Sequence, residues 1–566
     1  MKTRKYLAIL FLPLALAACQ SEKTARQDLV QPEEERVMLA PVRTPHPQIP
    51  APVEMKKNKE HLLSADMAMP ASTMAAPGKT AHYEMGRQKA RHEWNRESYS
   101  YNEEQGFQNV HNDPLSTFSI DVDTAAYSNI RRFINQGSMP PVGAVRIEEM
   151  LNYFSYNYPQ PSKGPFSVTT EVGPCLWETD HKLVRIGLKG KDIEKGNLPP
   201  SNLVFLIDVS GSMQAANKLP LLKKSMQMLV NQLGEKDRVA IVVYAGCDRV
   251  VLPPTSGNDK KTIIKAIDNL TAGGSTNGAS GIITAYNLAE RVLMPSGNNR
   301  IILASDGDFN VGVTSRGELQ KLVEKKSKSG IYLTVLGFGM GNYHDDTMEI
   351  LADKGNGNYA YIDNLMEAKK VLVKEMTGTM FAIAKDVKIQ VEFNPAQVAA
   401  YRLVGYENRM LADEDFNNDK KDAGEIGAGH TVTALYELIM AGGKDLPAID
   451  PLKYQRPSSA KIAAANDYGD ELLTVKIRYK KPNKKTSNLM SVVVKKSSER
   501  LADTSGDFHF ASAVAGFGMV LTDSAHKKKL SYETIIASAQ HGRGRDMNGY
   551  RAEFVRLVEN SELLNQ

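Results

Sequence analysis

Leu203-Val-Phe-Leu-Ile207 is an uninterrupted apolar run that leads directly into the polar stretch Asp208-Val209-Ser210-Gly211-Ser212. An apolar run of this kind is typical of a strand that is buried on both faces of a parallel sheet. An amphipathic helix is expected at 219–233, with Pro220 in its first turn, where proline is tolerated. This stretch therefore predicts a strand, a polar loop and a helix in that order.

The same alternation of strand and helix continues over residues 199–378. Further strands are expected at 238–244, 250–252, 301–305, 331–338 and 359–362, and helices at 261–270, 279–293, 317–326, 347–351 and 365–376. Strict alternation predicts an α/β fold with a doubly wound, mainly parallel sheet.

Three loops at the carboxyl ends of these strands carry hydroxyl and carboxylate side chains. The residues are Asp208, Ser210, Ser212, Thr276 and Asp306. Ligands of open parallel sheets bind at this edge, where the strand order reverses, so we expect the five side chains to face one crevice. Oxygen ligands without imidazole or thiolate suit Mg²⁺. An ion held mostly by neutral ligands remains electrophilic enough to accept a carboxylate oxygen from a partner.

The motif Asp208-Val-Ser-Gly-Ser212, followed by Thr276 and then by Asp306-Gly307, resembles the metal-ion-dependent adhesion site of von Willebrand factor type A (VWA) domains. The resemblance extends over residues 203–378. It implies a Rossmann-like VWA fold, a Mg²⁺ or Mn²⁺ cofactor, and a protein partner that offers an exposed Asp or Glu.

The resemblance also implies a role for each residue of the motif. Ser210 and Ser212 would bind the ion directly, and Thr276 directly or through water. Asp208 and Asp306 would act largely through water.

The N-terminus has the features of a bacterial export signal. A positive start is followed by an apolar segment at 6–18, which is too short to span a bilayer comfortably. Leu16-Ala-Ala-Cys19 resembles the lipobox of bacterial lipoproteins, which implies a signal peptide at 1–18 and a lipid anchor on Cys19. Gln20, rather than Asp, follows the cysteine and favours the outer membrane of the cell envelope. An ordinary signal peptide that ends in Cys is the alternative.

Residues 19–96 are rich in Pro, Ala, Met and mixed charge without a persistent period, which is typical of a flexible tether. An N-terminal flanking domain is expected at 97–198, the VWA domain at 199–378, and a C-terminal flanking domain at 379–566.

Alternating hydrophobicity in the two flanks predicts about seven antiparallel strands and then terminal helices. The strands are expected at 166–172, 182–188, 387–393, 401–406, 430–438, 472–479 and 489–495, and the helices at 510–521, 532–539 and 550–558. We hypothesise that these strands form one mostly antiparallel β-sandwich and that the VWA domain is an insertion in it. Parts of both flanks, such as 140–153 and 549–557, are similar to bacterial VWA lipoproteins whose flanking domains have no assigned chemistry.

Asp121 and Asp123 could together ligate a metal ion. We expect them instead to close a strand at 118–123 and to cap the helix at 124–133. The three cysteines of the chain are too few for a disulfide scaffold or a zinc site. Outside the cytoplasm Cys175 and Cys247 have the option of pairing, and the sequence leaves this open.

The charge balance gives no support for a nucleic-acid-binding protein. Lys and Arg number 70 against 65 Asp and Glu, a net charge of +5 that is spread along 566 residues instead of gathering in a basic stripe. The chain contains no HExxH, Walker A or GxSxG motif.

These observations favour a binding protein over an enzyme. It would be an envelope-anchored lipoprotein that holds an acidic residue of a protein partner through its metal ion, in adhesion, scaffolding or envelope assembly. The alternative is a metal-dependent hydrolase that uses the ion as a Lewis acid, but no general base or nucleophile stands out beside the motif. Two further alternatives are a vestigial metal site with functional flanking domains, and a subunit of a cytoplasmic ATPase, which conflicts with the lipobox.

Overall fold

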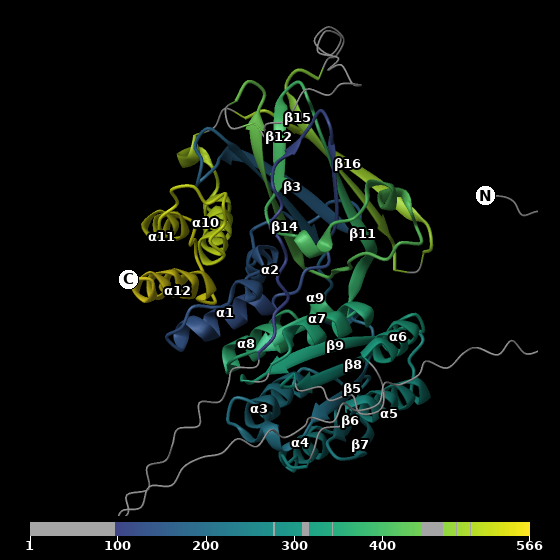
Figure 1. Cartoon of the computed structure of the whole chain (residues 1–566). Coiled ribbons are helices and arrows are strands. Elements are labelled where there is room, and N and C mark those ends of the chain that lie inside the picture. Colours follow the sequence, from purple (N-terminus) through teal and green to yellow (C-terminus); the bar gives the residue numbers. More distant parts are fainter. Residues whose placement is uncertain are drawn as a thin grey trace, which may run out of the picture. The chain divides into compact units, whose positions relative to one another are not determined.

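A six-stranded sheet forms the middle of the chain in the computed structural model (Figure 1). Its strands stand in the order β10-β9-β8-β5-β6-β7, and all neighbours are parallel except β6 and the edge strand β7. Because β5 lies between β6 and β8, the strand order reverses there, which confirms the doubly wound sheet. The bounds are β5 (Ser201–Asp208), β6 (Arg238–Tyr244), β7 (Asp248–Ser256), β8 (Asn298–Ser305), β9 (Ile331–Phe338) and β10 (Tyr359–Ile362).

The structure describes residues 97–274, 278–307, 316–341, 343–443, 446, 468–482, 484–497 and 500–566. The expected signal peptide, Cys19 and the expected tether lie outside the described residues, and so does Thr276.

Helices cover both faces of the sheet. Alternate residues of a strand point to opposite faces, so Phe205 and Ile207 pack against α3, α4 and α8, whereas Val204 and Leu206 pack against α5, α6 and α7. Two apolar layers explain why the run at 203–207 has no polar interruption. The helices are α3 (Leu219–Val230), α4 (Lys260–Asp268), α5 (Gly278–Arg291), α6 (Arg316–Ser327), α7 (Asp345–Lys354) and α8 (Leu365–Lys369), followed by a π-helical turn (Lys370–Lys374) and α9 (Met376–Met380).

The two flanks share one β-sandwich. Strands from before and after the VWA domain pair directly, β4 with β14 and β2 with β11, and both pairs are antiparallel. One sheet has the order β1-β12-β14-β4-β3, and the other has β13-β11-β15-β16 with β2 also beside β11. The hypothesis of an inserted VWA domain is therefore confirmed. The strands are β1 (Gln108–Asn109), β2 (Leu115–Ser119), β3 (Phe166–Pro174), β4 (Lys182–Gly190), β11 (Ala382–Phe393), β12 (Val398–Leu403), β13 (Ile426–Gly427), β14 (Thr431–Met440), β15 (Glu471–Lys480) and β16 (Ser487–Lys495).

A helical layer from both ends of the described chain completes the fold. It consists of α1 (Ala125–Asn135), α2 (Ile147–Tyr153), α10 (Gly506–Leu521), α11 (Tyr532–His541) and α12 (Tyr550–Leu564). Aromatic side chains such as Phe154, Phe510 and Phe554 form its core. Within the ranges that the structure describes, no helix combines the length and the apolar character needed to cross a membrane.

Two expectations about single residues are wrong. Asp123 does not cap the following helix, whose N-cap is Thr124 without a side-chain hydrogen bond. Instead, Asp123 accepts a hydrogen bond of 2.8 Å from the backbone N–H of Tyr359 and forms an ion pair of 3.4 Å with Arg409. Strand β2 ends at Ser119, before either aspartate. Asp123 thus bonds to residues distant in the sequence instead of capping the helix that follows it.

The open question of a disulfide is also answered in the structure. Cys175 and Cys247 are both free thiols. Cys175 is buried in the helical core of the flanks, whereas Cys247 is exposed in the turn between β6 and β7 of the VWA domain. Their pairing would require one of them to leave its own part of the fold.

Candidate metal centre

The polar residues of the DxSxS motif lie at the carboxyl edge of the parallel sheet. Asp208 is the last residue of β5, and Ser210 is the N-cap of a short 3₁₀-helix, Gly211–Gln214. Asp306 directly follows β8, the parallel neighbour of β5. The fold therefore brings these three residues to the same edge, as the sequence predicts.

Local hydrogen bonds hold the motif in place. The backbone N–H of Ser210 donates to Asp208 Oδ1 at 2.9 Å, and the Ser305 hydroxyl donates to Asp208 Oδ2 at 3.1 Å. The hydroxyls of Ser210 and Ser212 lie 2.9 Å apart. Ser212 is exposed, whereas Ser210, Asp208 and Asp306 are buried, so Ser212 lies at the rim of the site and the other three residues lie below it.

The loop that precedes Thr276 joins the same edge. The backbone N–H of Gly211 donates to the carbonyl of Gly274 at 3.1 Å, and the N–H of Gly273 donates to the carbonyl of Val209 at 2.7 Å. Thr276 itself lies outside the described residues, so its expected place in the ligand set stays a prediction.

Burial decides the electrostatics of the central carboxylate. It raises the pKa of Asp208 to about 6, and the negative charge of Asp306 adds to the rise. Hydrogen bonds from Ser210 and Ser305 act in the opposite direction. A cation bound beside Asp208 would therefore stabilise the ionised form of this carboxylate.

Sequence reasoning missed a lysine at this site. The ammonium Nζ of Lys218 lies 2.8 Å from Oδ2 of Asp306, and the two side chains are only 11% and 2% exposed. The available signal was its position, six residues after Ser212 and directly before the predicted helix. Only the adjacency of β5 and β8 reveals its partner, because the two residues are 88 positions apart.

A glycine makes room for this lysine. Gly339, just after β9, has a positive φ of 80°, and a Cβ at this position would lie only 2.3–2.8 Å from the Lys218 methylenes. The carbonyl of Gly339 accepts a hydrogen bond from the hydroxyl of Tyr361. Two residues on, the N–H of Gly341 donates to Glu97 of the N-terminal flank at 2.8 Å. The segment under the lysine is thus fixed from both sides.

The donor set fits a hard divalent ion. It offers two carboxylates and the serine hydroxyls, which are the oxygen ligands that Mg²⁺ and Mn²⁺ prefer. The described part of the chain contains no group of three or more His, Cys, Asp or Glu side chains placed to hold a metal. The DxSxS edge has only two such residues and relies on hydroxyls for the remaining ligands.

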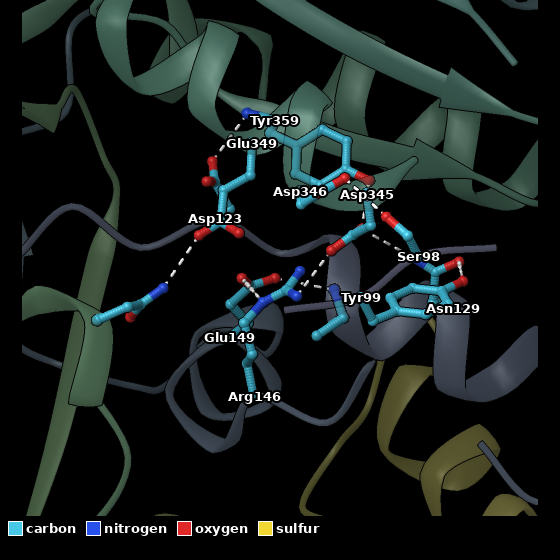
Figure 2. A network of polar contacts seen from close by, with 12 residues as sticks. Ser98, Tyr99, Asp123, Asn129, Arg146, Glu149, Asp345, Asp346, Glu349 and Tyr359 are labelled. Atoms are coloured by element: carbon cyan, nitrogen blue, oxygen red, sulfur yellow. Dashed lines mark hydrogen bonds and ion pairs between the residues drawn. The ribbon is translucent and has the colours of Figure 1, made fainter. Parts of the chain in front are cut away.

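A second polar cluster ties the VWA domain to the flanks. Figure 2 shows Asp345, the first residue of α7, beside Arg146 and Tyr359. Arg146 Nη1 lies 2.7 Å from the Asp345 carboxylate, and the hydroxyl of Tyr359 donates to it at 2.5 Å. Arg146 also pairs with Glu149, whose other oxygen accepts the N–H of Ala126 at 2.8 Å. The charged groups of this cluster are paired with one another, and they join α2 of the flank to α7 of the VWA domain.

Comparisons with known proteins agree with this architecture. A family model of the von Willebrand factor type A domain matches residues 202–374, and a model described as von Willebrand factor matches residues 93–185. A model described as the C-terminal part of the uncharacterized protein YfbK matches residues 378–564.

Among curated proteins, the chain is 45% identical to YfbK of Escherichia coli K12 over 458 residues, which cover 80% of this chain and 78% of that protein. It is 23% identical to the E3 ubiquitin-protein ligase WAV3 of Arabidopsis thaliana, over 57% of this chain and 45% of that one. It is 24% identical to human inter-alpha-trypsin inhibitor heavy chain H3, over 43% of this chain and 29% of that protein. The chain spans less than half the length of these last two proteins.

Solved structures resemble parts of the chain. A von Willebrand factor type A protein from Catenulispora acidiphila is 14% identical and covers 69% of this chain and 90% of its own, with a TM-score of 0.38. BatB from Bacteroides thetaiotaomicron is 21% identical, and the match covers 31% of this chain and 97% of BatB, with a TM-score of 0.27.

Proposed function

This chain belongs to the family of Escherichia coli YfbK and carries a von Willebrand factor type A domain between its two flanks. From this premise we propose that it is a binding protein of the bacterial cell envelope. Its VWA domain would hold another protein through a divalent ion that accepts an Asp or Glu of that partner. VWA domains are protein-interaction modules, and the finer assignment rests on the DxSxS edge.

The observation that carries the proposal is the pair of buried carboxylates, Asp208 and Asp306, at the same edge as the exposed hydroxyl of Ser212. Ser210 and Ser212 would contact Mg²⁺ or Mn²⁺ directly, Thr276 directly or through water, and Asp208 and Asp306 largely through water. Bound there, the ion would act as a Lewis acid for a carboxylate oxygen of the partner. The rim position of Ser212 leaves one side of the set open to such a partner.

Binding, rather than catalysis, is the role that the neighbours of the site support. The ammonium of Lys218, the lysine at this edge, is occupied by the carboxylate of Asp306 at 2.8 Å and does not point a free amine at the site. Burial raises the pKa of Tyr244, which faces Asp208, well above its ordinary value and keeps its hydroxyl neutral.

We further propose that the chain is anchored in the outer membrane by lipid on Cys19, with residues 19–96 as the spacer. Stable anchoring requires more than one acyl chain, which lipobox processing supplies. In the native host, Cys19→Ser is expected to move the protein from the membrane fraction to the soluble fraction. Unchanged fractionation of this variant would contradict the anchor and leave the metal site untouched.

The metal site is tested by thermal unfolding of the full chain in Mg²⁺ and in EDTA. A ligand that binds only the native state stabilises it by about 2.7 kcal/mol at a hundredfold excess over Kd. The wild type and the control Asp180→Ala, an exposed aspartate of the flank, should gain this stability in Mg²⁺, whereas Asp208→Ala should not. Equal unfolding of the wild type in Mg²⁺ and EDTA would contradict a metal centre that is occupied in the isolated wild-type protein.

A further inference from the structure

The lysine at the DxSxS edge is a built part of the site. Lys218 is the N-cap residue of α3, where its carbonyl accepts the N–H of Leu222 at 2.9 Å. Its own N–H donates to the carbonyl of Ala215 at 3.0 Å. The backbone that carries the lysine is thus fixed between the DxSxS turn and the helix, and its side chain is 11% exposed.

The path of the side chain is also enclosed. Its methylenes cross the bare Cα of Gly339, and its ammonium ends on Asp306 at 2.8 Å. A long, flexible side chain loses considerable entropy when it is confined in this way. The ion pair with a nearly buried carboxylate offsets that cost.

The charge of this lysine bears directly on metal binding. Asp306 is one of the two carboxylates at the edge, and in the structure its Oδ2 is engaged by the ammonium. A divalent ion would have to draw on the same carboxylate while lying near a like charge. At the effective dielectric of a protein surface, repulsion between such charges a few ångströms apart lowers affinity by tenfold or more.

We propose that Lys218 is a resident counter-ion that competes with the divalent cation for Asp306 and thereby sets the metal affinity of the site. Metal binding then requires the ammonium to release the carboxylate. The inference rests on the proposed function, since it concerns the same centre, but it makes a separate prediction.

The experiment measures Mn²⁺ binding to the full chain by calorimetry and by the electron paramagnetic resonance signal of free Mn²⁺. Lys218→Met removes the charge and keeps an unbranched stem over Gly339, whereas Lys218→Arg keeps the charge. The Met variant should bind Mn²⁺ about tenfold or more tightly than the wild type, and the Arg variant within about threefold of it. Asp306→Asn should lose the binding in either background.

Each outcome separates the two ideas. Equal or weaker Mn²⁺ binding by Lys218→Met, with measurable binding by the wild type, overturns the counter-ion and leaves the metal centre standing. Absence of Mn²⁺ binding in the wild type and in both variants overturns both. Binding by the Met variant alone supports the counter-ion and limits the metal centre to conditions that displace the lysine.

A measurement on the wild type guards against misfolded variants. Amine-reactive labelling followed by peptide mass spectrometry reports the accessibility of Lys218, with exposed Lys224 of the same helix as the internal control. Lys218 should react slowly in EDTA and several-fold faster in saturating Mn²⁺, whereas Lys224 should not change. An unchanged Lys218 rate in Mn²⁺ would refute the release of the ammonium.

Discussion

The guanidinium of Arg146 lies 2.7 Å from the carboxylate of Asp345, and the two side chains are 5% and 0% exposed. Arg146 is the N-cap residue of α2 in the flank, and Asp345 is the first residue of α7 in the VWA domain. A buried ion pair therefore joins two elements that are 199 positions apart in the sequence. This ion pair holds the VWA domain to the flanks in addition to the covalent connections of the backbone.

Removal of one partner of this pair should be costly. Arg146→Ala leaves the Asp345 and Glu149 carboxylates buried without their cation, so we expect a loss of about 3–5 kcal/mol in the free energy of unfolding. Urea denaturation measures this loss. Arg500→Ala, which removes an exposed guanidinium from an ion pair with Asp503, should leave the transition unchanged. Equal losses in the free energy of unfolding for the two variants would show that the buried pair contributes no more to stability than the exposed one.

Asp121 predicts a pH dependence of stability. Burial raises its pKa to about 7, the nearby Asp353 carboxylate adds to the rise, and Arg409 opposes it. The folded state thus holds a proton that the unfolded state, with a pKa of about 3.9, has released. The stabilising contribution is fully present below that unfolded value and is lost as the pH rises through about 7.

Asp121→Asn should remove this dependence. The variant is expected to exceed the wild type in stability at pH 8 by about 2 kcal/mol, and the difference should shrink towards pH 5. Urea titrations at several pH values measure it, with exposed Asp180→Asn as the control. A difference that does not vary with pH would contradict the assignment to Asp121.

The glycine under the lysine stem offers a matched pair of variants. Gly339 and Gly330 have similar positive φ angles of 80° and 86°, but only Gly339 has atoms within reach of an added Cβ. Both alanine variants should lose about 1–2 kcal/mol for the backbone conformation, and Gly339→Ala about 1–3 kcal/mol more for the collision with Lys218. Thermal or urea unfolding compares them.

A double-mutant cycle identifies the source of the extra loss. If the lysine stem causes it, Lys218→Ala should abolish the difference between the two glycine variants. A difference that persists in the Lys218→Ala background would place the collision elsewhere.

The two thiols of the described chain should differ in reactivity. Cys247 is exposed, whereas Cys175 is buried and its pKa lies well above the ordinary value because of that burial. Iodoacetamide should therefore alkylate Cys247 in the native protein within minutes and Cys175 only after denaturation, as read by peptide mass spectrometry. Protection of both thiols, with release by reductant, would reveal a disulfide instead.

Local patterns predicted the elements well because they depend on neighbouring residues. The expected strands at 472–479 and 489–495 correspond to β15 (Glu471–Lys480) and β16 (Ser487–Lys495), whose alternation follows the pleat. The strand at 118–123 was displaced to β2 (Leu115–Ser119), because a polar stretch after it turns towards partners in another part of the fold.

The site was predictable in part for the same reason. Asp208 and Ser210 are close in sequence, and their hydrogen bond forms within one turn. Asp306 joins them through sheet order, which the alternation of strands and helices already implies. Thr276 remains a prediction of the motif.

The class of the fold and the edge at which the polar loops meet could be predicted from the sequence alone, whereas the insertion of the VWA domain was a hypothesis that the pairing of β4 with β14 and of β2 with β11 decided. The fold class and the edge follow from hydrophobic periodicity and turn chemistry, which act over a few residues. Three features emerge only from the packing of the whole chain: Lys218 reaches Asp306, Asp123 accepts a hydrogen bond from Tyr359, and the two thiols stay apart. Such contacts join residues tens to hundreds of positions apart, and packing selects them from many partners of equal chemistry.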